Sequence, residues 1–315
     1  MPLCKSVLSF SYESIDEMSS KMRAADSPDG VTRKPPISKD FHISDDQLFT
    51  ALAPIAILKD IQICIASGDY SAASVCWAEY MDSRKDAPLP AHHLASELRN
   101  NALIEDADYI AEHRIRISGS RRTDFGKEIN FISLVKEHRL EELHSLSFLA
   151  NLTTAYRLTK AAKYVAAFQD ILSQWFAQYL KVQPASESHP VWNDSSCGIR
   201  IIAVLDAYNE MKSEKIFSPA FHKMMLSIVL SSARWLYCSQ EEYRSGSPAL
   251  DACAALILAG VYLPELREAS EWLDHGIKCI IEKTSKEFNK EGAFCEMSDA
   301  YAVKSLTASF LSINC

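Results

Sequence analysis

Apolar residues recur at helical spacing over most of the chain. Between Leu149 and Tyr156 they fall at positions i, i+3, i+4 and i+7, which places them on one face of a helix. The same spacing continues from Tyr164 to Tyr179. No segment shows the alternation of apolar and polar residues that is typical of a half-buried strand. The pattern therefore predicts an all-α fold.

Residues that start and stop helices extend this prediction along the chain. Gly68 and Gly260 are expected to end helices, because glycine adopts the backbone conformations that follow a last helical turn. Ser218 and Pro219 form a good pair of N-cap and first helical residue. Further helices are expected at 45–68, 70–82, 199–211, 250–258 and 266–288, and from the Ser218-Pro219 pair onward.

The predicted helices form pairs that repeat. The first helix of each pair begins near residues 143, 195 and 248, an interval of about 52 residues. A helical hairpin with one apolar face cannot bury that face alone, so neighbouring hairpins must stack. The interval therefore predicts stacked helical hairpins, and both a solenoid and a closed ring satisfy it.

Composition narrows the class of protein. Glycine occurs only 9 times in 315 residues, below the usual ~7%, which favours helices with short connections. The net charge of −8 argues against a nucleic-acid-binding surface, although a local basic cleft can coexist with an acidic exterior. Pro, Gly and Ser gather near residue 30, so we expect a polar tail or linker at 1–40 and one helical domain at 41–315.

The cysteines and the hydropathy profile carry predictions of their own. The nine cysteines are odd in number and include no CxxC motif, so we expect buried free thiols in a reducing compartment, with no metal and no cofactor. No apolar stretch reaches the length of a membrane span, and the first residues do not read as a signal peptide. The sequence as it stands predicts a cytoplasmic protein, or a periplasmic one if the true start differs.

Four stretches, taken in order, resemble a known family. They are ADYIAEHRIRISGSRRTDFGKEINF (107–131), LSFLANLTTAYRLTKAAKYVAAFQDILSQWF (146–176), ALILAGVYLPELREASEWL (255–273) and EGAFCEMSDAY (291–301). Each resembles a part of the N-terminal domain of heparinase II/III-type polysaccharide lyases. The resemblance implies an (α/α) toroid of stacked helical hairpins. Because the chain ends at Cys315, we expect an incomplete toroid, with the family's C-terminal β-sandwich absent.

The resemblance also implies a chemistry. The family cleaves uronic-acid polysaccharides by β-elimination, which requires the substrate carboxylate to be neutralised, the C5 proton removed and the leaving oxygen protonated. Tyr301 falls on the family's catalytic tyrosine. A phenol has an ordinary pKa of about 10, so it acts as a base only beside a stabilising cation, and as an acid without one. The alternative is a tyrosine that lines the toroid and bonds a loop.

Other matching positions predict contacts with the glycan. Trp192 and Arg200 are similar to a Trp and an Arg of the family, where the indole stacks on a sugar and the guanidinium binds a carboxylate. The alternative is a buried Trp and a salt-bridged Arg. His144 matches a polar element of the first hairpin, and its alternative is a surface or partly satisfied histidine. For Glu296 two roles are expected: it orients another side chain of the site, or it only caps a helix.

One catalytic position departs from the family. Its Asn-His pair falls on Ser247 and Pro248 here. Proline has no titratable group, whereas Ser247 still offers one hydrogen bond to a glycan and opens the helix normally. The sequence therefore predicts a lyase-like toroid that acts on or binds an acidic glycan, with impaired or incomplete β-elimination and no nucleic-acid or membrane partner.

Two other functions stay open at this point. The first is a non-catalytic carbohydrate-binding or assembly module on the same scaffold, which Ser247-Pro248 favours. The second is a helical-repeat scaffold with a concave protein-binding face. If the protein is an enzyme, the resemblance makes it a carbon–oxygen lyase acting on polysaccharides.

Overall fold

The structure of the protein is a computed structural model. It describes residues 43–85, 100–117, 121–131, 140–179, 190–239 and 247–287, all within one compact unit, Ser38–Cys315. The tail predicted at 1–40 lies outside these residues, so its boundary stays a prediction.

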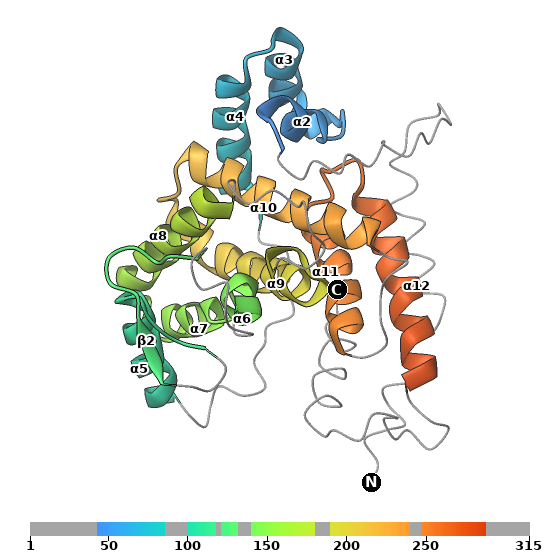
Figure 1. The fold of residues 1–315 in the computed structure, drawn as a ribbon. Helices are drawn as coiled ribbons and strands as arrows, with labels where there is room; N and C mark the ends of the chain where they lie inside the picture. Colours follow the sequence, from blue (N-terminus) through green and yellow to red (C-terminus); the bar gives the residue numbers. More distant parts are fainter. Residues whose placement is uncertain are drawn as a thin grey trace. The chain divides into compact units, whose positions relative to one another are not determined.

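The described residues are mainly helical (Figure 1). The α-helices are α2 (Asp45–Thr50), α3 (Lys59–Ser67), α4 (Tyr70–Ser83), α5 (Asn100–Ala111), α6 (Leu140–Ser145), α7 (Leu149–Thr159), α8 (Ala162–Tyr179), α9 (Asp194–Met211), α10 (Pro219–Cys238), α11 (Ser247–Tyr262) and α12 (Ala269–Glu287). Three 3₁₀ turns, η2 (Ala56–Leu58), η4 (Pro190–Trp192) and η5 (Lys212–Glu214), and two strands, β1 (Arg114–Arg116) and β2 (Arg122–Asp124), complete the described elements.

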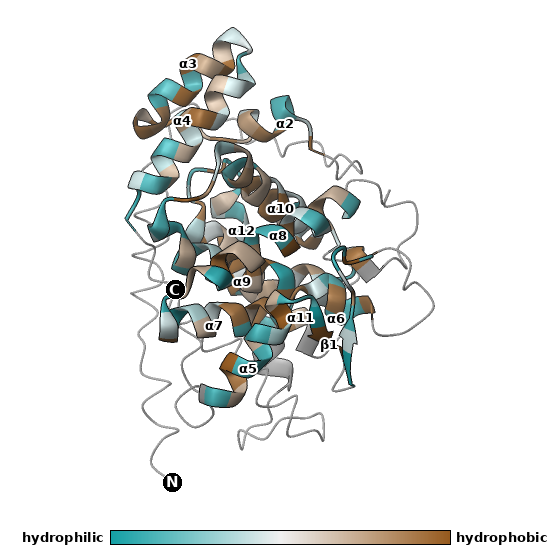
Figure 2. Cartoon of the chain, turned by 90° about the vertical axis from the view of Figure 1, so that its left-hand side faces the viewer, coloured by the Kyte–Doolittle hydropathy of each residue, from teal (hydrophilic) through white to brown (hydrophobic). Residues whose placement is uncertain are grey.

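The predicted pairing of helices is confirmed. α7 packs on α8, α9 on α10, and α11 on α12, while α9 also contacts α6, α7 and α11. α9 begins at Asp194 and α11 at Ser247, close to the predicted repeat. α11 is largely hydrophobic (Figure 2), and its residues from Ala249 to Gly260 are all buried, as expected for a helix that is apolar all round. Successive hairpins thus bury their apolar faces against one another.

Several helix ends follow the predicted signals. The Ser44 side chain accepts from the backbone N–H of Gln47 and closes a capping box before Asp45. Ser218 caps α10, with Pro219 at the first helical position. Gly68 ends α3 with φ of 74°, the left-handed conformation that glycine adopts without strain. These ends agree with the boundaries expected from the sequence.

The single helix predicted at 45–68 is wrong, because the chain leaves the helix after α2. Pro54 lacks a backbone N–H and disfavours a helical conformation at the preceding residue. The freed backbone pairs with a distant segment instead. Leu52 and Leu266 form an isolated β-bridge, and the N–H of Ala53 donates to the carbonyl of Glu265 at 2.7 Å. The segment just before Pro54 therefore joins the α11–α12 connection.

The helix stop predicted at Gly260 is also wrong. α11 continues through Gly260 to Tyr262. A Cβ atom at Gly260 would lie 2.6 Å from the carbonyl oxygen of Ala269 and 3.3 Å from the Cβ of Leu273. Glycine is present because α12 approaches α11 closely at this point, and not because the helix ends.

A short antiparallel hairpin accompanies the helices, although no segment of the sequence shows the alternation that is typical of a strand. β1 pairs with β2, with Ile115 opposite Thr123. His113, with φ of 59°, lies at the start of the hairpin, and its ring contacts the carbonyl of Gly126 and the carboxylate of Asp170 on α8. The strands are only three residues long, which is too short for an alternating pattern to be recognised in the sequence.

The prediction that the cysteines are free thiols is wrong for one pair. Cys253 on α11 and Cys279 on α12 form a disulfide. Cys197 is a buried free thiol, as predicted, and three further described cysteines are half-buried free thiols. The expectation failed because helices that are distant in sequence bring Cys253 and Cys279 together.

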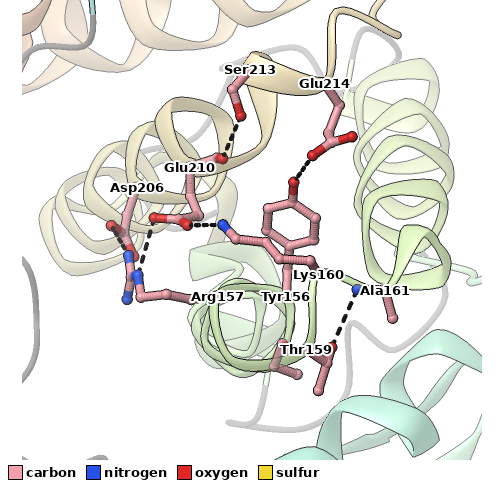
Figure 3. A network of polar contacts seen from close by, with 10 residues as sticks. Tyr156, Arg157, Thr159, Lys160, Ala161, Asp206, Glu210, Ser213 and Glu214 are labelled. Carbon is pink, nitrogen blue, oxygen red and sulfur yellow. Dashed lines mark hydrogen bonds and ion pairs between the residues drawn. The ribbon is translucent and has the colours of Figure 1, made fainter.

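A network of polar contacts joins the ends of α7 and α9 (Figure 3). Arg157 of α7 donates to Glu210 at 3.0 Å and lies 3.4 Å from Asp206. Lys160 donates to Glu210 at 2.9 Å. These pairs are partly exposed, so each contributes on the order of 0–1 kcal/mol. The network aligns the first two repeats at the surface rather than in the core.

Candidate functional site

Arg200 is the centre of the predicted site, and it is fully buried. It lies in the second turn of α9 with none of its surface exposed. Its guanidinium donates to the carbonyl of His144 at 3.0 Å and to the carbonyl of Val191 at 3.2 Å. It also donates to Oγ of Ser232 at 3.2 Å and lies 3.1 Å from Sγ of Cys197. One cation thus connects α6, η4, α9 and α10.

The aromatic neighbours of Arg200 complete its surroundings. The guanidinium carbon lies 4.8 Å from the centre of the Trp175 ring, which is the distance of a cation–π contact. Among the described residues, Arg200 forms no ion pair with a carboxylate. Within the part of the chain that the structure describes, its positive charge is therefore stabilised by carbonyl, hydroxyl and thiol dipoles and by the ring face. A buried cation held in this way raises the local electrostatic potential and favours a nearby anion.

His144 lies at the end of α6 and is 2% exposed. The indole N–H of Trp175 lies 3.3 Å from Nδ1 of His144. Because an indole nitrogen can only donate, Nδ1 must be the acceptor. When neutral, His144 therefore carries its proton on Nε2. Trp175 and Arg200 together fix both the tautomer of His144 and the position of its backbone carbonyl.

Trp192 lies in η4 and is 1% exposed. Its ring centre is 5.1 Å from Tyr179 and 5.4 Å from Trp235, and Tyr179 stacks on Trp175 at 4.7 Å. Tyr179 donates to Oγ of Ser231 at 3.0 Å, and burial raises its pKa well above the usual range. The indole of Trp192 thus belongs to an aromatic cluster at the end of α8.

Gly198 sets the close approach of α9 and α11. A Cβ atom at Gly198 would lie 3.0 Å from the backbone carbon of Asp251 and 3.1 Å from the nitrogen of Ala252, so any side chain there would be tightly crowded. This contact lies one turn after Ser247 opens α11. Gly198 precedes Arg200 by two residues, which is about 200° around a helix, so α11 packs on a different face of α9 from the one that carries Arg200.

The structure thus joins several residues that the sequence singled out. His144, Trp192 and Arg200 lie in one buried cluster, whereas Ser247 opens α11, which packs on α9 at Gly198. Tyr301 and Glu296 lie outside the described residues. The roles of all six residues in glycan binding or catalysis stay predictions.

The described residues include no group of three His, Cys, Asp or Glu side chains placed to hold a metal ion. Within the same ranges, no helix combines the length and the hydrophobicity needed to cross a bilayer.

Comparison with protein families identifies the fold to which this cluster belongs. The family model described as Heparinase II/III N-terminus matches residues 48–314, most of the chain. The chain belongs to the heparinase II/III family.

Curated relatives extend this result. A heparin-sulfate lyase of Pedobacter heparinus is 22% identical over 265 residues, which cover 79% of this chain and 39% of that protein. A heparin-sulfate lyase of Bacteroides thetaiotaomicron is 22% identical over 285 residues, covering 85% and 40%. The chain thus spans about two fifths of the length of these relatives.

Solved structures show the same fold. The heparan sulfate lyase HepC from Pedobacter heparinus superposes with a TM-score of 0.66 at 20% identity, covering 85% of this chain and 44% of that one. A structure of heparinase III superposes with a TM-score of 0.70 at 17% identity, covering 87% and 43%. The fold is therefore of the all-α, (α/α) toroid class that the sequence predicted.

The sequence did not single out two residues of the cluster in this heparinase II/III chain. Trp175 and Ser232 lie on helices whose apolar spacing makes them look like ordinary core positions.

Proposed function

We propose that this chain is the helical domain of a heparinase II/III-type polysaccharide lyase and binds acidic glycans that contain uronic acid. The observation that carries the proposal is the convergence of His144, Trp192 and Arg200 in one buried cluster. These residues come from two successive repeats and are positions where the sequence resembles the family's site. Heparan-sulfate-type glycans are the first substrate class to test, since both curated relatives are heparin-sulfate lyases.

The chemistry of the cluster is compatible with a carboxylate ligand. Arg200 places a buried positive charge within this cluster, and its hydrogen bonds are already made within the protein. We therefore assign Arg200 to the electrostatic field of the site and not to a direct clamp on the sugar. Tyr301 would donate a proton to the leaving oxygen, or would remove the C5 proton if a cation stabilised its phenolate.

We further propose that β-elimination is impaired. α11 begins at Ser247, so the Ser-Pro pair opens the helix where the family carries Asn-His. An imidazole and an amide are thereby replaced by a hydroxyl and a ring without a donor. Loss of one donor that stabilises a developing negative charge reduces kcat by on the order of 10²–10³.

A non-catalytic glycan-binding or assembly module is the second candidate. The burial of Trp192 and Arg200 favours it, because their side chains are already used within the fold. Such a module would bind acidic glycans with a surface other than these two side chains.

The proposal is tested with the full chain and three acidic polysaccharides: heparan sulfate, hyaluronan and alginate. Ultraviolet absorbance reports the unsaturated uronate that β-elimination creates, and calorimetry reports binding separately. We expect binding to at least one glycan, with slow product formation that Tyr301→Phe abolishes. Tyr109→Phe, which removes a hydroxyl from α5, is the matched control and should leave both signals unchanged.

The possible results separate the candidates. Binding without product in the wild type, unaltered by Tyr301→Phe, supports the non-catalytic module. Restoring the family pair with Ser247→Asn and Pro248→His should raise turnover if the rest of the site is intact. Absence of both binding and product with all three glycans contradicts the proposed function.

A further inference from the structure

A second buried polar cluster lies away from the Arg200 site and involves His222 of α10. His222 has none of its surface exposed. The hydroxyl of Tyr208 on α9 lies 2.5 Å from Nδ1 of His222. On the other side, Nε2 lies 3.4 Å from Oδ1 of Asp82 at the end of α4. A carboxylate, an imidazole and a phenol thus form a line across three helices.

In this row of three side chains, His222 has a hydrogen bond with Tyr208 but none with Asp82. Tyr208 is buried and its pKa is raised well above 10, so its hydroxyl keeps its proton and donates it to Nδ1. Nε2 of His222 and Oδ1 of Asp82 are both buried and form no hydrogen bond in the described structure. Neutral His222 therefore carries its proton on Nε2, which lies 3.4 Å from Oδ1 of Asp82 without the geometry of a hydrogen bond.

Little solvent can reach His222. A cavity of about 10 Å³ beside it is lined mainly by apolar side chains, together with Tyr208 and Tyr262. A space of this size holds at most about one water molecule. A charged imidazole would thus have no water shell to replace its protein partners.

Protonation of His222 would disturb this arrangement. A proton on Nδ1 would face the hydroxyl of Tyr208, which would have to turn, accept a hydrogen bond and find a new acceptor for its own proton. The groups that face His222 from neighbouring elements are Asp82, Lys212 and Tyr208, with Arg84 and Tyr262 next to them. Burial, the largest effect, lowers the pKa of His222. Asp82 and a hydrogen bond to the backbone of Phe217 oppose that change, and Lys212 adds to it.

The same cluster holds α4 on the repeats. Ser74 of α4 donates to the carbonyl of Pro219 at 3.1 Å. Arg84, just after α4, donates to Glu265 at 2.9 Å, and Tyr80 also donates to this carboxylate. Lys212 donates to the carbonyl of Arg84 at 2.9 Å. The end of α4 is thus held by the ion pair beside the His222 cluster, while the rest of α4 packs on α2, α3 and α10.

We propose that Asp82, His222 and Tyr208 form an acid-sensitive latch that docks α4 on α9 and α10 and loosens in mild acid. The direction follows from linkage. The folded state binds the proton less well than the unfolded state, whose histidine titrates near the ordinary value of 6.5. The stabilisation is therefore complete above about pH 6.5. It declines as the pH falls from there towards the lower pKa of the folded state.

Hydrogen exchange of the α4 amides, followed by mass spectrometry and corrected for intrinsic rates, tests the latch in the full chain. In the wild type, the opening equilibrium of α4 should rise by up to about tenfold for each pH unit below about 6.5. His222→Asn keeps an acceptor for Tyr208 but cannot be protonated, so its α4 exchange should not respond to pH in this range. The same pH dependence in His222→Asn and the wild type overturns the proposal.

Two further variants make the test specific. Tyr208→Phe retains His222 but removes the hydroxyl that would have to change from hydrogen-bond donor to acceptor when His222 is protonated. The increase of α4 exchange at low pH should therefore be smaller in this variant. An undiminished response in Tyr208→Phe overturns the latch even if His222→Asn does not fold. His275→Asn is the matched control. Burial also lowers the pKa of His275, but this histidine lies on α12, against Tyr237, and outside the proposed latch. If His275→Asn abolishes the response of α4, the assignment to His222 is wrong.

Discussion

Replacing Arg200 with methionine removes the cation that joins three segments of the candidate site while keeping a side chain of similar length. The carbonyl oxygens of His144 and Val191 lose this donor. A hydrogen bond from a charged donor contributes about 1.5–3 kcal/mol, and two such bonds to these carbonyls are lost. Packing of the methionine side chain on the ring of Trp175 offsets this loss of stability by about 1 kcal/mol. The expected net destabilisation is about 3 kcal/mol.

Two comparison variants test whether the guanidinium geometry matters. Arg200→Lys keeps the charge but presents its donors from a single nitrogen, which cannot span the carbonyls and Ser232 at once. We expect Arg200→Lys to be destabilised nearly as much as Arg200→Met. Arg157→Met removes an arginine that is 24% exposed and paired at the surface, so it should cost on the order of 0–1 kcal/mol.

The assay combines urea unfolding, followed by tryptophan fluorescence, with glycan binding to each folded variant. Equal slopes of unfolding free energy against urea would show that the midpoints report stability alone. The reasoning is refuted if Arg200→Met unfolds at the wild-type midpoint and yet loses glycan affinity. That result would mean that the guanidinium binds the sugar carboxylate directly, as the sequence suggested.

Three further predictions follow from the packing of α11 on α12 and from the aromatic cluster. Gly276→Ala should destabilise by about 1–3 kcal/mol in urea unfolding, since its Cβ would lie 2.7 Å from the carbonyl oxygen of Cys253; a gain in stability would contradict the close approach. Reducing the Cys253–Cys279 disulfide should lower the free energy of unfolding by about 3.5 kcal/mol, the value expected for a loop of 26 residues. Peptide mapping that finds both cysteines as free thiols would refute the disulfide. Trp175→Phe removes the donor to Nδ1 of His144, so nitrogen-15 NMR should then show a mixture of the two neutral tautomers. A proton on Nδ1 of His144 in the wild type would disprove the assignment.

Local sequence signals predicted the helices well because each signal acts within a few residues. The Ser218-Pro219 pair and Gly68 set helix ends through their own backbone conformation and hydrogen bonds. The apolar spacing from Leu149 to Tyr179 marked two helices, since a helix places every third or fourth residue on one face. The repeat interval followed from the same periodicity.

Long-range contacts account for the errors. Gly260 looks like a helix stop, and only the approach of Ala269 from α12 shows why a glycine is needed within the helix. Pro54 ends the helical stretch, and the segment before it pairs with residues more than 200 positions away, which no local pattern shows. The thiols of Cys253 and Cys279 meet because two helices pack side by side.

The candidate site divides in the same way. The residue types in the sequence, read against a family, identified His144, Trp192 and Arg200 as a related set. Only the tertiary structure decided that Arg200 donates inward to backbone carbonyls, because its partners come from α6, η4 and α10. The sequence by itself determined the helical repeat through local periodicity. The partner of each buried polar group was decided by packing between distant helices.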